Sequence, residues 1–203
     1  MDKDHSILYI VRHGQTDWNV QRLIQGQTDV PLNKTGEVQA GKLSEKLRGI
    51  NFDAAFSSDL SRAKKTAEII TMEKKIAVST TNALRERYFG KFQGHSFGNN
   101  KNIAKMIDNL KKLDKDSEGE IENDEALMGR FITFLREVAV AYIGKTVLVV
   151  THAGVMRTFL VRLGWGTEDA IKEGHIDNLA FIKLESDGVD FFVRETSGIR
   201  QAE

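Results

Sequence analysis

The chain has 203 residues, with 29 basic and 29 acidic side chains, so its formal net charge at pH 7 is zero. This balance argues against a general binder of nucleic acids or anionic membranes but leaves room for a local basic pocket. The absence of cysteine excludes disulfides, thiol nucleophiles and thiolate metal ligands. Residues 1–6 lack the apolar core of a signal peptide, and no apolar run approaches the roughly 20 residues of a membrane span. We therefore expect a cytoplasmic protein with one domain, residues 1–203.

Apolar periodicity and turn residues predict helices and strands that alternate along most of the chain. The run at Ile7–Val11 is continuously apolar, which is typical of a strand buried on both faces. Either Ser58 or Asp59 is the expected N-cap of the helix that follows the second strand. The predicted elements, in order, are a strand at 7–11, a helix at 35–48, a strand at 52–58, a helix at 58–70, a strand at 75–80, a helix at 123–143, a strand at 146–151, a helix at 154–163, and a closing hairpin of 178–184 and 189–195 with a turn at Asp187-Gly188.

Residues 85–125 carry no strand signal and include glycines, a lysine-rich stretch and an acidic stretch. We interpret about 91–122 as a cap or insertion on the domain. An equally weighted alternative is a solvated surface excursion without a function.

The order of elements predicts an α/β fold, a three-layer sandwich whose mostly parallel sheet has an antiparallel edge strand and helices on both faces. Ligands in such folds bind outside the carboxyl ends of the strands. Polar side chains stand at three of those ends, and we expect them to converge: Arg12-His13, Ser57-Ser58 with Arg62 just beyond, and Thr151-His152.

This set of side chains suits a phosphate monoester. The guanidiniums of Arg12 and Arg62 are planar forks that bind oxyanions, and the helices that begin after Ser58 and His152 point N–H donors at the same place. A metal site is disfavoured because no HxH or HExxH spacing occurs and two arginines repel a cation. A nucleophilic imidazole fits better: it must be neutral, with a backbone carbonyl holding the proton of its other nitrogen. In-line transfer to it would yield a phosphohistidine.

The leaving alkoxide needs a proton donor, and Glu86 lies just after the third predicted strand. A carboxyl beside a bound dianion is driven towards its protonated form, and the carboxylate left behind could activate water. The alternatives for these residues are structural. Glu86, between Arg85 and Arg87, could form a surface ion pair, and His152 could be a satisfied core histidine.

At this point the chain resembles the histidine phosphatase superfamily, on the branch of the cofactor-dependent phosphoglycerate mutases. The matching motifs occur in the family's order: "VRHGQTDWN", "QGQTDVPLNKTGEVQA", "FSSDLSRAKKTAEII", "LRERYFGKFQG" and "VVTHAGVMRTFL". The resemblance implies a phosphoglycerate mutase-like fold with no metal and no cofactor. It implies these roles: His13 as the phosphorylated nucleophile, Arg12, Arg62 and His152 as the phosphate pocket, Glu86 as the proton donor, Asn19 as a ligand of the phosphoryl oxygens, and Gln25, Gly26 and Arg87 beside the substrate.

Mutases and phosphatases of the family share these residues. The mutases carry a longer insertion with a basic residue soon after the motif's last glycine and an adjacent arginine pair. Here Gly94 is followed by His95, and no arginine pair lies between Arg87 and Arg130. These departures favour a phosphatase of a small phosphorylated metabolite, acting as a monomer or homodimer. A mutase, a bisphosphate phosphatase of sugars or glycerate, and a catalytically silent phosphate-binding scaffold stay open as alternatives.

Two smaller features concern specificity. Glu122-Asn123 stands where the family has a Glu-Ser pair in a segment that closes over the substrate, but asparagine replaces serine. His95 follows the family's glycine and is either a surface residue or a substrate contact. We expect the cap, 91–122, to determine specificity.

Overall fold

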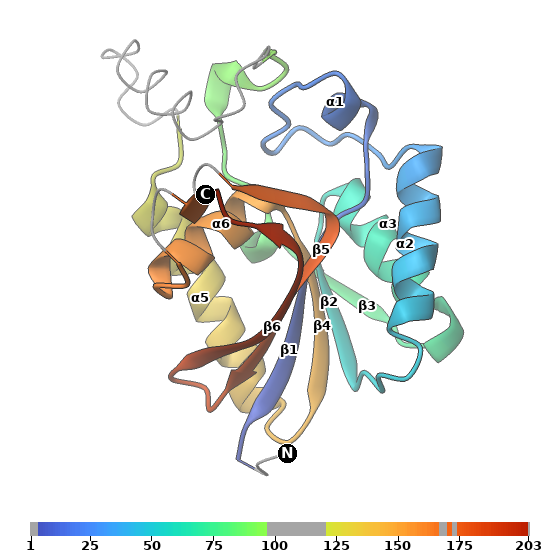
Figure 1. Cartoon of the computed structure of the whole chain (residues 1–203), viewed down its shortest axis with the longest axis vertical. Coiled ribbons are helices and arrows are strands. Elements are labelled where there is room, and N and C mark those ends of the chain that lie inside the picture. Colours follow the sequence, from blue (N-terminus) through green and yellow to red (C-terminus); the bar gives the residue numbers. More distant parts are fainter. Residues whose placement is uncertain (1–3, 97–120, 167–169, 172–173, 203) are drawn as a thin grey trace.

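A mixed β-sheet runs through the middle of the molecule (Figure 1). The computed structural model describes residues 4–96, 121–166, 170–171 and 174–202. Within these ranges six strands form one sheet in the order β3-β2-β4-β1-β5-β6. Their bounds are β1 Ser6–Arg12, β2 Ala54–Ser58, β3 Val78–Thr81, β4 Thr146–Thr151, β5 His175–Ser186 and β6 Phe191–Arg200. The first four run parallel to one another, and the β5–β6 hairpin joins β1 antiparallel, as predicted.

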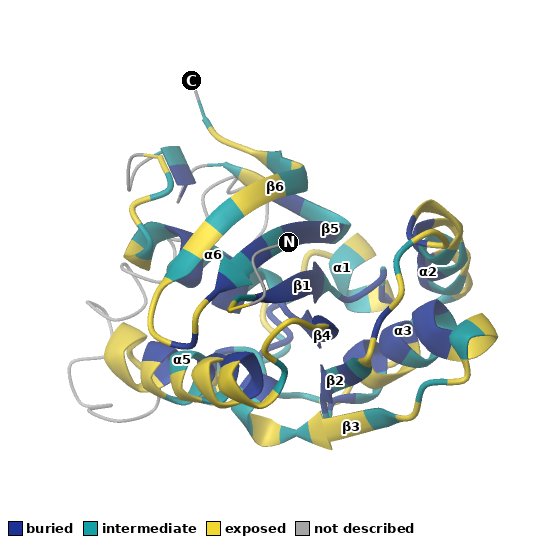
Figure 2. Cartoon of the chain, turned by 90° about the horizontal axis from the view of Figure 1, so that it is seen from below, coloured by how far each residue is buried: buried dark blue, intermediate teal, exposed yellow. Residues whose placement is uncertain are grey.

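Helices cover both faces of the sheet, which confirms the three-layer α/β fold (Figures 1 and 2). The helices α2 (Lys34–Lys46) and α3 (Ser61–Thr71) lie on one face, and α5 (Asp124–Ala141) and α6 (Ala153–Arg162) lie on the other. The remaining described helical elements are short: α1 Asp17–Val20, η1 Met72–Lys74, η2 Asn82–Leu84 and η3 Gly90–Phe92.

The two central strands, β1 and β4, are buried on both sides (Figure 2). Leu8 and Ile10 of β1 point into the core under α5 and α6, whereas Tyr9 and Val11 belong to the core under α2 and α3. This double burial explains the continuous apolar run in the sequence. Because the two cores fix β1 from both faces, the position of the residue that follows Arg12 is fixed as well.

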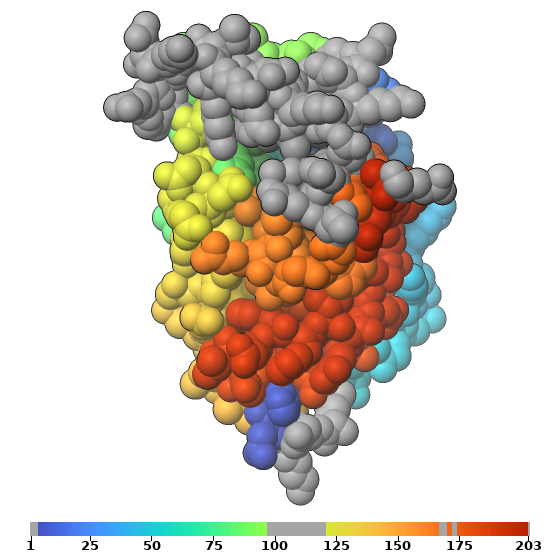
Figure 3. Space-filling model, turned by 60° about the vertical axis from the view of Figure 1, so that its left-hand side comes forward, coloured from blue at the N-terminus to red at the C-terminus, as the bar shows by residue number. Residues whose placement is uncertain are grey.

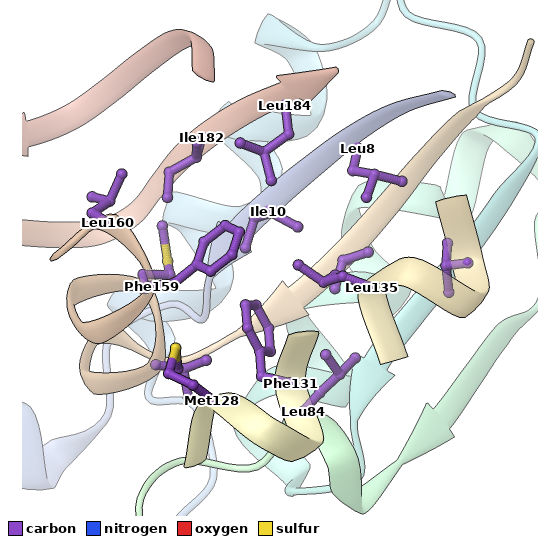
Figure 4. Close-up of a cluster of buried hydrophobic side chains, with 14 of the residues drawn as sticks. Leu8, Ile10, Leu84, Met128, Phe131, Leu135, Phe159, Leu160, Ile182 and Leu184 are labelled. Atoms are coloured by element: carbon purple, nitrogen blue, oxygen red, sulfur yellow. The ribbon is translucent and has the colours of Figure 1, made fainter. Parts of the chain in front are cut away.

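The core under α5 and α6 is built from an apolar stripe along α5 that meets α6 and the sheet (Figure 4). Phe131 packs edge-on against Phe159 of α6, with ring centroids 5.3 Å apart. The hairpin of β5 and β6 contributes to the same core, where Phe191 packs edge-on against Phe159 of α6 with ring centroids 5.6 Å apart, and it lies along one side of the molecule (Figure 3). No helix in the described ranges is long and apolar enough to cross a bilayer.

The predicted capping of α3 is wrong. The N-cap is Leu60, and neither Ser58 nor Asp59 caps the helix with its side chain. Asp59 instead forms two 2.7 Å hydrogen bonds with Arg85, and the carboxylate of Asp29 accepts from the amide of Ser61 at 2.8 Å. The cap is thus supplied by a residue distant in sequence, which local patterning does not reveal.

We predict that Leu135→Ala lowers the free energy of unfolding by about 2–5 kcal/mol, because Leu135 is fully buried in this core and its truncation leaves a cavity. Val140→Ala is the matched control on the same helix, since Val140 is 59% exposed, and should change it by less than about 0.5 kcal/mol. Urea denaturation at pH 7 measures both. Equal losses for the two variants would contradict the described core.

Candidate active site

His13 stands at the carboxyl edge of the sheet, directly after β1, and is only 4% exposed. Its amide donates to the carbonyl of Thr151 at 3.0 Å, which ties it to the end of β4. The ring nitrogen Nδ1 lies 2.7 Å from the carbonyl oxygen of Gly14. A carbonyl only accepts, so Nδ1 carries the proton and the lone pair of Nε2 is left for chemistry.

The charge state of His13 follows from its surroundings. Burial lowers the pKa of His13 well below its usual 6.5, and the positive charges of Arg62 and Arg12 lower it further. The imidazole is therefore neutral at pH 7, as a nucleophile must be.

Gly14 is required by a close approach. A Cβ at this position would lie 2.7 Å from the carbonyl oxygen of Gly36 in the first turn of α2. The amide of Gly14 donates to Thr66 of α3 at 3.0 Å. Two helices thus hold the turn that presents the His13 ring.

His152 follows β4 and lies beside His13, with ring centroids 5.1 Å apart. The residue is fully buried, and neither ring nitrogen has a hydrogen-bond partner among the residues that the structure describes. Burial, followed by the charge of Arg62, lowers the pKa of His152 well below 6.5. Because buried polar atoms are nearly always hydrogen-bonded, these nitrogens mark a place for a polar ligand.

Arg62 is fully buried, and Arg12 is partly buried beside it. The guanidinium of Arg62 donates to the carbonyls of Thr28 at 2.8 Å and Gly26 at 2.7 Å, and that of Arg12 donates to the carbonyl of Ile176 at 2.5 Å. Each Nε atom is buried without a partner, and neither guanidinium forms an ion pair with a described carboxylate.

Electrostatics agree with this arrangement. Burial lowers the pKa of Arg12 and of Arg62 to about 10 in each case, against the attraction of Glu86. Both groups stay cationic at neutral pH. Two desolvated cations with unused donors, next to two neutral imidazoles, suit a phosphoryl dianion.

The carboxylate of Glu86 is anchored at the start of α6. Its Oε2 accepts from the amide of Gly154 at 2.9 Å, and its Oε1 accepts from the amide of Arg87 at 2.8 Å. A Cβ at Gly154 would collide with Oε1 of Glu86 and push the carboxylate away from this amide, so glycine favours the approach. The Gly154 amide, which the sequence assigned to phosphate, is thus used by Glu86, just as the Ser61 amide is used by Asp29.

The loop of residues 16–28 brings the predicted binding residues to the same place. Asn19 caps α1 reciprocally with Thr16, and its Oδ1 accepts from Asn178. The side-chain oxygen of Gln25 accepts from Thr16 at 3.0 Å. The carbonyl of Gly26 accepts from Arg62, so the loop is attached directly to the phosphate pocket.

Arg87 is placed differently from the other predicted site residues. Its guanidinium lies 2.7 Å from the carboxylate of Asp124 and donates to the carbonyl of Glu122 at 2.6 Å and to Thr158 at 3.1 Å. These bonds join α5 to α6, and none of them reaches His13.

The specificity predictions are only partly covered by the described residues. Residues 97–120 of the predicted cap lie outside them. The side chain of His95 is exposed and its ring contacts Phe92 at 6.3 Å between centroids, while its backbone carbonyl pairs with Ile24.

Sequence reasoning missed two neighbours of the site. Asn178 donates to the carbonyl of His13 at 3.1 Å from an irregular part of β5, where Leu179 adopts a positive φ of 61°. Arg157 of α6 is a third cation near Glu86, and it donates to the carbonyl of Ile171. Its spacing of three residues from Gly154 puts it on the same side of α6, a signal that was available.

The part of the chain that the structure describes contains no cluster of metal-ligating side chains. No group of three or more histidine, aspartate or glutamate side chains there is arranged to hold a metal ion. The arrangement can bind a phosphoryl group, attack it with His13 Nε2 and exchange protons through Glu86.

Comparisons with known proteins agree with this geometry. Residues 8–197 match the family model of the histidine phosphatase superfamily, branch 1. The chain is 37% identical to "Phosphoglycerate mutase-like protein 4" of Arabidopsis thaliana, over 79% of this chain and 72% of that protein. It is 36% identical to "Broad-specificity phosphatase YOR283W" of Saccharomyces cerevisiae, over 81% and 73% respectively.

A solved structure extends the likeness to the whole fold. The crystal structure of phosphoglycerate mutase from Bacillus anthracis str. Sterne superimposes with a TM-score of 0.82 at 25% identity, covering 98% of this chain and 96% of that one. The fold, the motifs in their order and the family model lead to one conclusion: this chain belongs to branch 1 of the histidine phosphatase superfamily.

Proposed function

We propose that this protein is a metal-independent phosphatase that hydrolyses a small phosphate monoester through a phosphohistidine on His13. The observation that carries the proposal is the His13 ring itself. Its Nδ1 proton is held by the Gly14 carbonyl at 2.7 Å, so neutral Nε2 is free to attack beside two arginines without carboxylate partners.

In the first step the Nε2 lone pair of His13 attacks phosphorus, and the bond from phosphorus to the leaving oxygen breaks. Glu86 transfers its carboxyl proton to that oxygen, and the alcohol departs. Arg12, Arg62 and His152 stabilise the charge on the equatorial oxygens. The side-chain nitrogen Nδ2 of Asn19 has no hydrogen-bond partner among the described residues, whereas Oδ1 accepts from Thr16 and Asn178, so Nδ2 is a further donor for them.

In the second step the Glu86 carboxylate takes a proton from water as the water oxygen attacks phosphorus. The bond between phosphorus and Nε2 breaks, which releases inorganic phosphate and regenerates neutral His13 and protonated Glu86. Glu86 is thus the acid of the first step and the base of the second, while Arg12, Arg62 and His152 stabilise the phosphoryl oxygens in both.

Phosphatase activity is favoured over mutase activity by the placement of Arg87. Its guanidinium is used by Asp124, Glu122 and Thr158 and offers no grip for a substrate carboxylate. No adjacent arginine pair lies between Arg87 and Arg130. The yeast relative, named a broad-specificity phosphatase, supports the same preference.

We predict that the protein releases phosphate from p-nitrophenyl phosphate in the presence of EDTA, and that His13→Ala lowers kcat/KM at least about 1,000-fold by removing the nucleophile. Absorbance of p-nitrophenolate after an alkaline quench measures the rate. His95→Ala, at an exposed side chain that makes no described contact with His13, should keep nearly full activity.

Two results would overturn this proposal. Absence of His13-dependent hydrolysis of any phosphate ester would leave the silent scaffold as the better account. Rapid isomerisation of 3-phosphoglycerate when 2,3-bisphosphoglycerate is added would make the protein a mutase.

The buried neutral histidines predict a pH dependence of stability. The folded pKa values of His13 and His152 lie well below the unfolded value of 6.5. Above pH 6.5 both rings are neutral in the folded and in the unfolded chain, so folding does not have to remove a proton from either ring. Below pH 6.5 the unfolded chain binds protons that the folded chain does not. The free energy of unfolding then falls by at most about 1.4 kcal/mol per pH unit for each histidine until the folded pKa is reached.

Urea denaturation at pH 7 and pH 5, in buffer without phosphate, measures this loss. The double variant His13→Asn, His152→Asn should lose less stability over the same interval than the unaltered protein. An equal loss in both proteins would contradict the neutral burial of the two rings.

A further inference from the structure

Arg130 of α5 is hydrogen-bonded to the backbone segment that carries Glu86. Its Nη1 donates to the carbonyls of Ala83 at 2.8 Å and Arg85 at 2.7 Å, and its Nη2 donates to the carbonyl of Glu86 at 3.1 Å. Ala83 belongs to the short η2 helix, and the residues from Arg85 to Tyr88 follow it outside the sheet, so no strand ladder fixes them. The hydrogen bonds of Arg130 therefore help to fix the backbone of a segment that no sheet holds.

Glu122 completes the arrangement from the other side. Its two oxygens accept from Arg130 Nε at 2.7 Å and Nη2 at 2.8 Å, a bidentate pair that fixes the plane of the guanidinium. Glu122 also exchanges backbone and side-chain hydrogen bonds with Tyr88, two residues beyond Glu86.

The pair is largely shielded from water. The side chains of Arg130 and Glu122 are only 22% and 14% exposed. Burial raises the pKa of Glu122, but the hydrogen bond and charge of Arg130 outweigh it and bring the pKa below its usual value. Glu122 therefore stays ionised, and the bracket of Arg130 and Glu122 spans the chain from 83 to 88.

Glu86 is thus fixed at two points by two helices. Its carboxylate is held by the Gly154 amide at the start of α6, and its carbonyl is held by Arg130 of α5 and by Gln27, 3.1 Å away. Proton transfer requires the acid within hydrogen-bond reach of the leaving oxygen, so a small displacement of this peptide is costly. Arg130 binds the backbone carbonyl of Glu86 and not its carboxyl group, and it makes no described contact with His13.

We propose that Arg130, braced by Glu122, is a positioning residue for proton donation by Glu86. The inference rests on the proposed function, in which Glu86 protonates the leaving oxygen. In this proposal Glu122 helps to hold Glu86 in place through Arg130. This role does not require the serine that the family has after this glutamate and that is Asn123 here.

The test compares two leaving groups, since nitrophenolate departs without a proton whereas an alkoxide requires one. We predict that Arg130→Lys, which keeps the charge but loses the planar fork, lowers kcat/KM for β-glycerophosphate at least about tenfold more than for p-nitrophenyl phosphate. The inhibition constant of inorganic phosphate should change by less than about twofold, because Arg12, Arg62 and His152 are untouched.

Arg136→Lys is the matched control, since Arg136 lies on the same helix and, among the described residues, its guanidinium binds the carbonyl of Val189 on the distant hairpin. This variant should change kcat/KM only slightly, and by the same factor for both substrates. Glu122→Gln, which removes the bracing charge while keeping the shape, should discriminate between the substrates in the same direction as Arg130→Lys. It also decides the question if Arg130→Lys does not fold.

The variant Glu86→Gln distinguishes a failure of the positioning role of Arg130 from a failure of the acid role of Glu86. If Glu86→Gln discriminates between the leaving groups while neither Arg130→Lys nor Glu122→Gln does, the positioning role is wrong and the proposed acid stands. If Glu86→Gln lowers kcat/KM equally for β-glycerophosphate and p-nitrophenyl phosphate, the acid role itself is wrong, and the inference fails with it.

Discussion

Two guanidiniums without carboxylate partners, Arg12 and Arg62, are the constraint on which the rest of the site depends. Placing such charges in a protein interior is unfavourable unless dipoles or a ligand compensate them. Here the carbonyls of Ile176, Thr28 and Gly26 supply part of the compensation, and the Nε atoms have no partner within the described part of the chain. Burial keeps His13 neutral, and the same two charges lower its pKa further while they suit a dianion, so the pocket that would bind a phosphoryl group also favours the neutral imidazole.

The scaffold delivers this arrangement through parallel strands and close backbone contacts. Because β1, β2 and β4 run in the same direction, His13, Arg62 and His152 meet at one edge of the sheet although 139 positions separate the first from the last. Gly14 lets α2 approach the His13 turn, and Gly154 lets α6 approach Glu86. Glycine is needed at both positions because a side chain would separate catalytic groups from the backbone that orients them.

The fold and the core of the site could be predicted because both follow from local rules. An apolar strand ending in Arg12-His13 and another ending in Thr151-His152 are enough to place two imidazoles together. The capping of α3 and the orientation of Arg87 were not predictable, because each depends on partners distant in sequence, Asp29 in one case and Asp124 with Glu122 and Thr158 in the other. Asn178 was hidden for a related reason: an irregularity in β5, invisible in the strand pattern, turns it towards His13.

The most direct measurement of the central claim is the site of covalent phosphorylation during turnover. The protein would be mixed with a phosphate ester, quenched in alkali within milliseconds to preserve acid-labile bonds, digested and analysed by mass spectrometry. With p-nitrophenyl phosphate, whose leaving group departs without a proton, we predict a phosphoryl group on His13 that is absent from His13→Ala and accumulates in Glu86→Gln, where water is not activated. A phosphoryl group on His152, or none on any residue during rapid turnover, would contradict it.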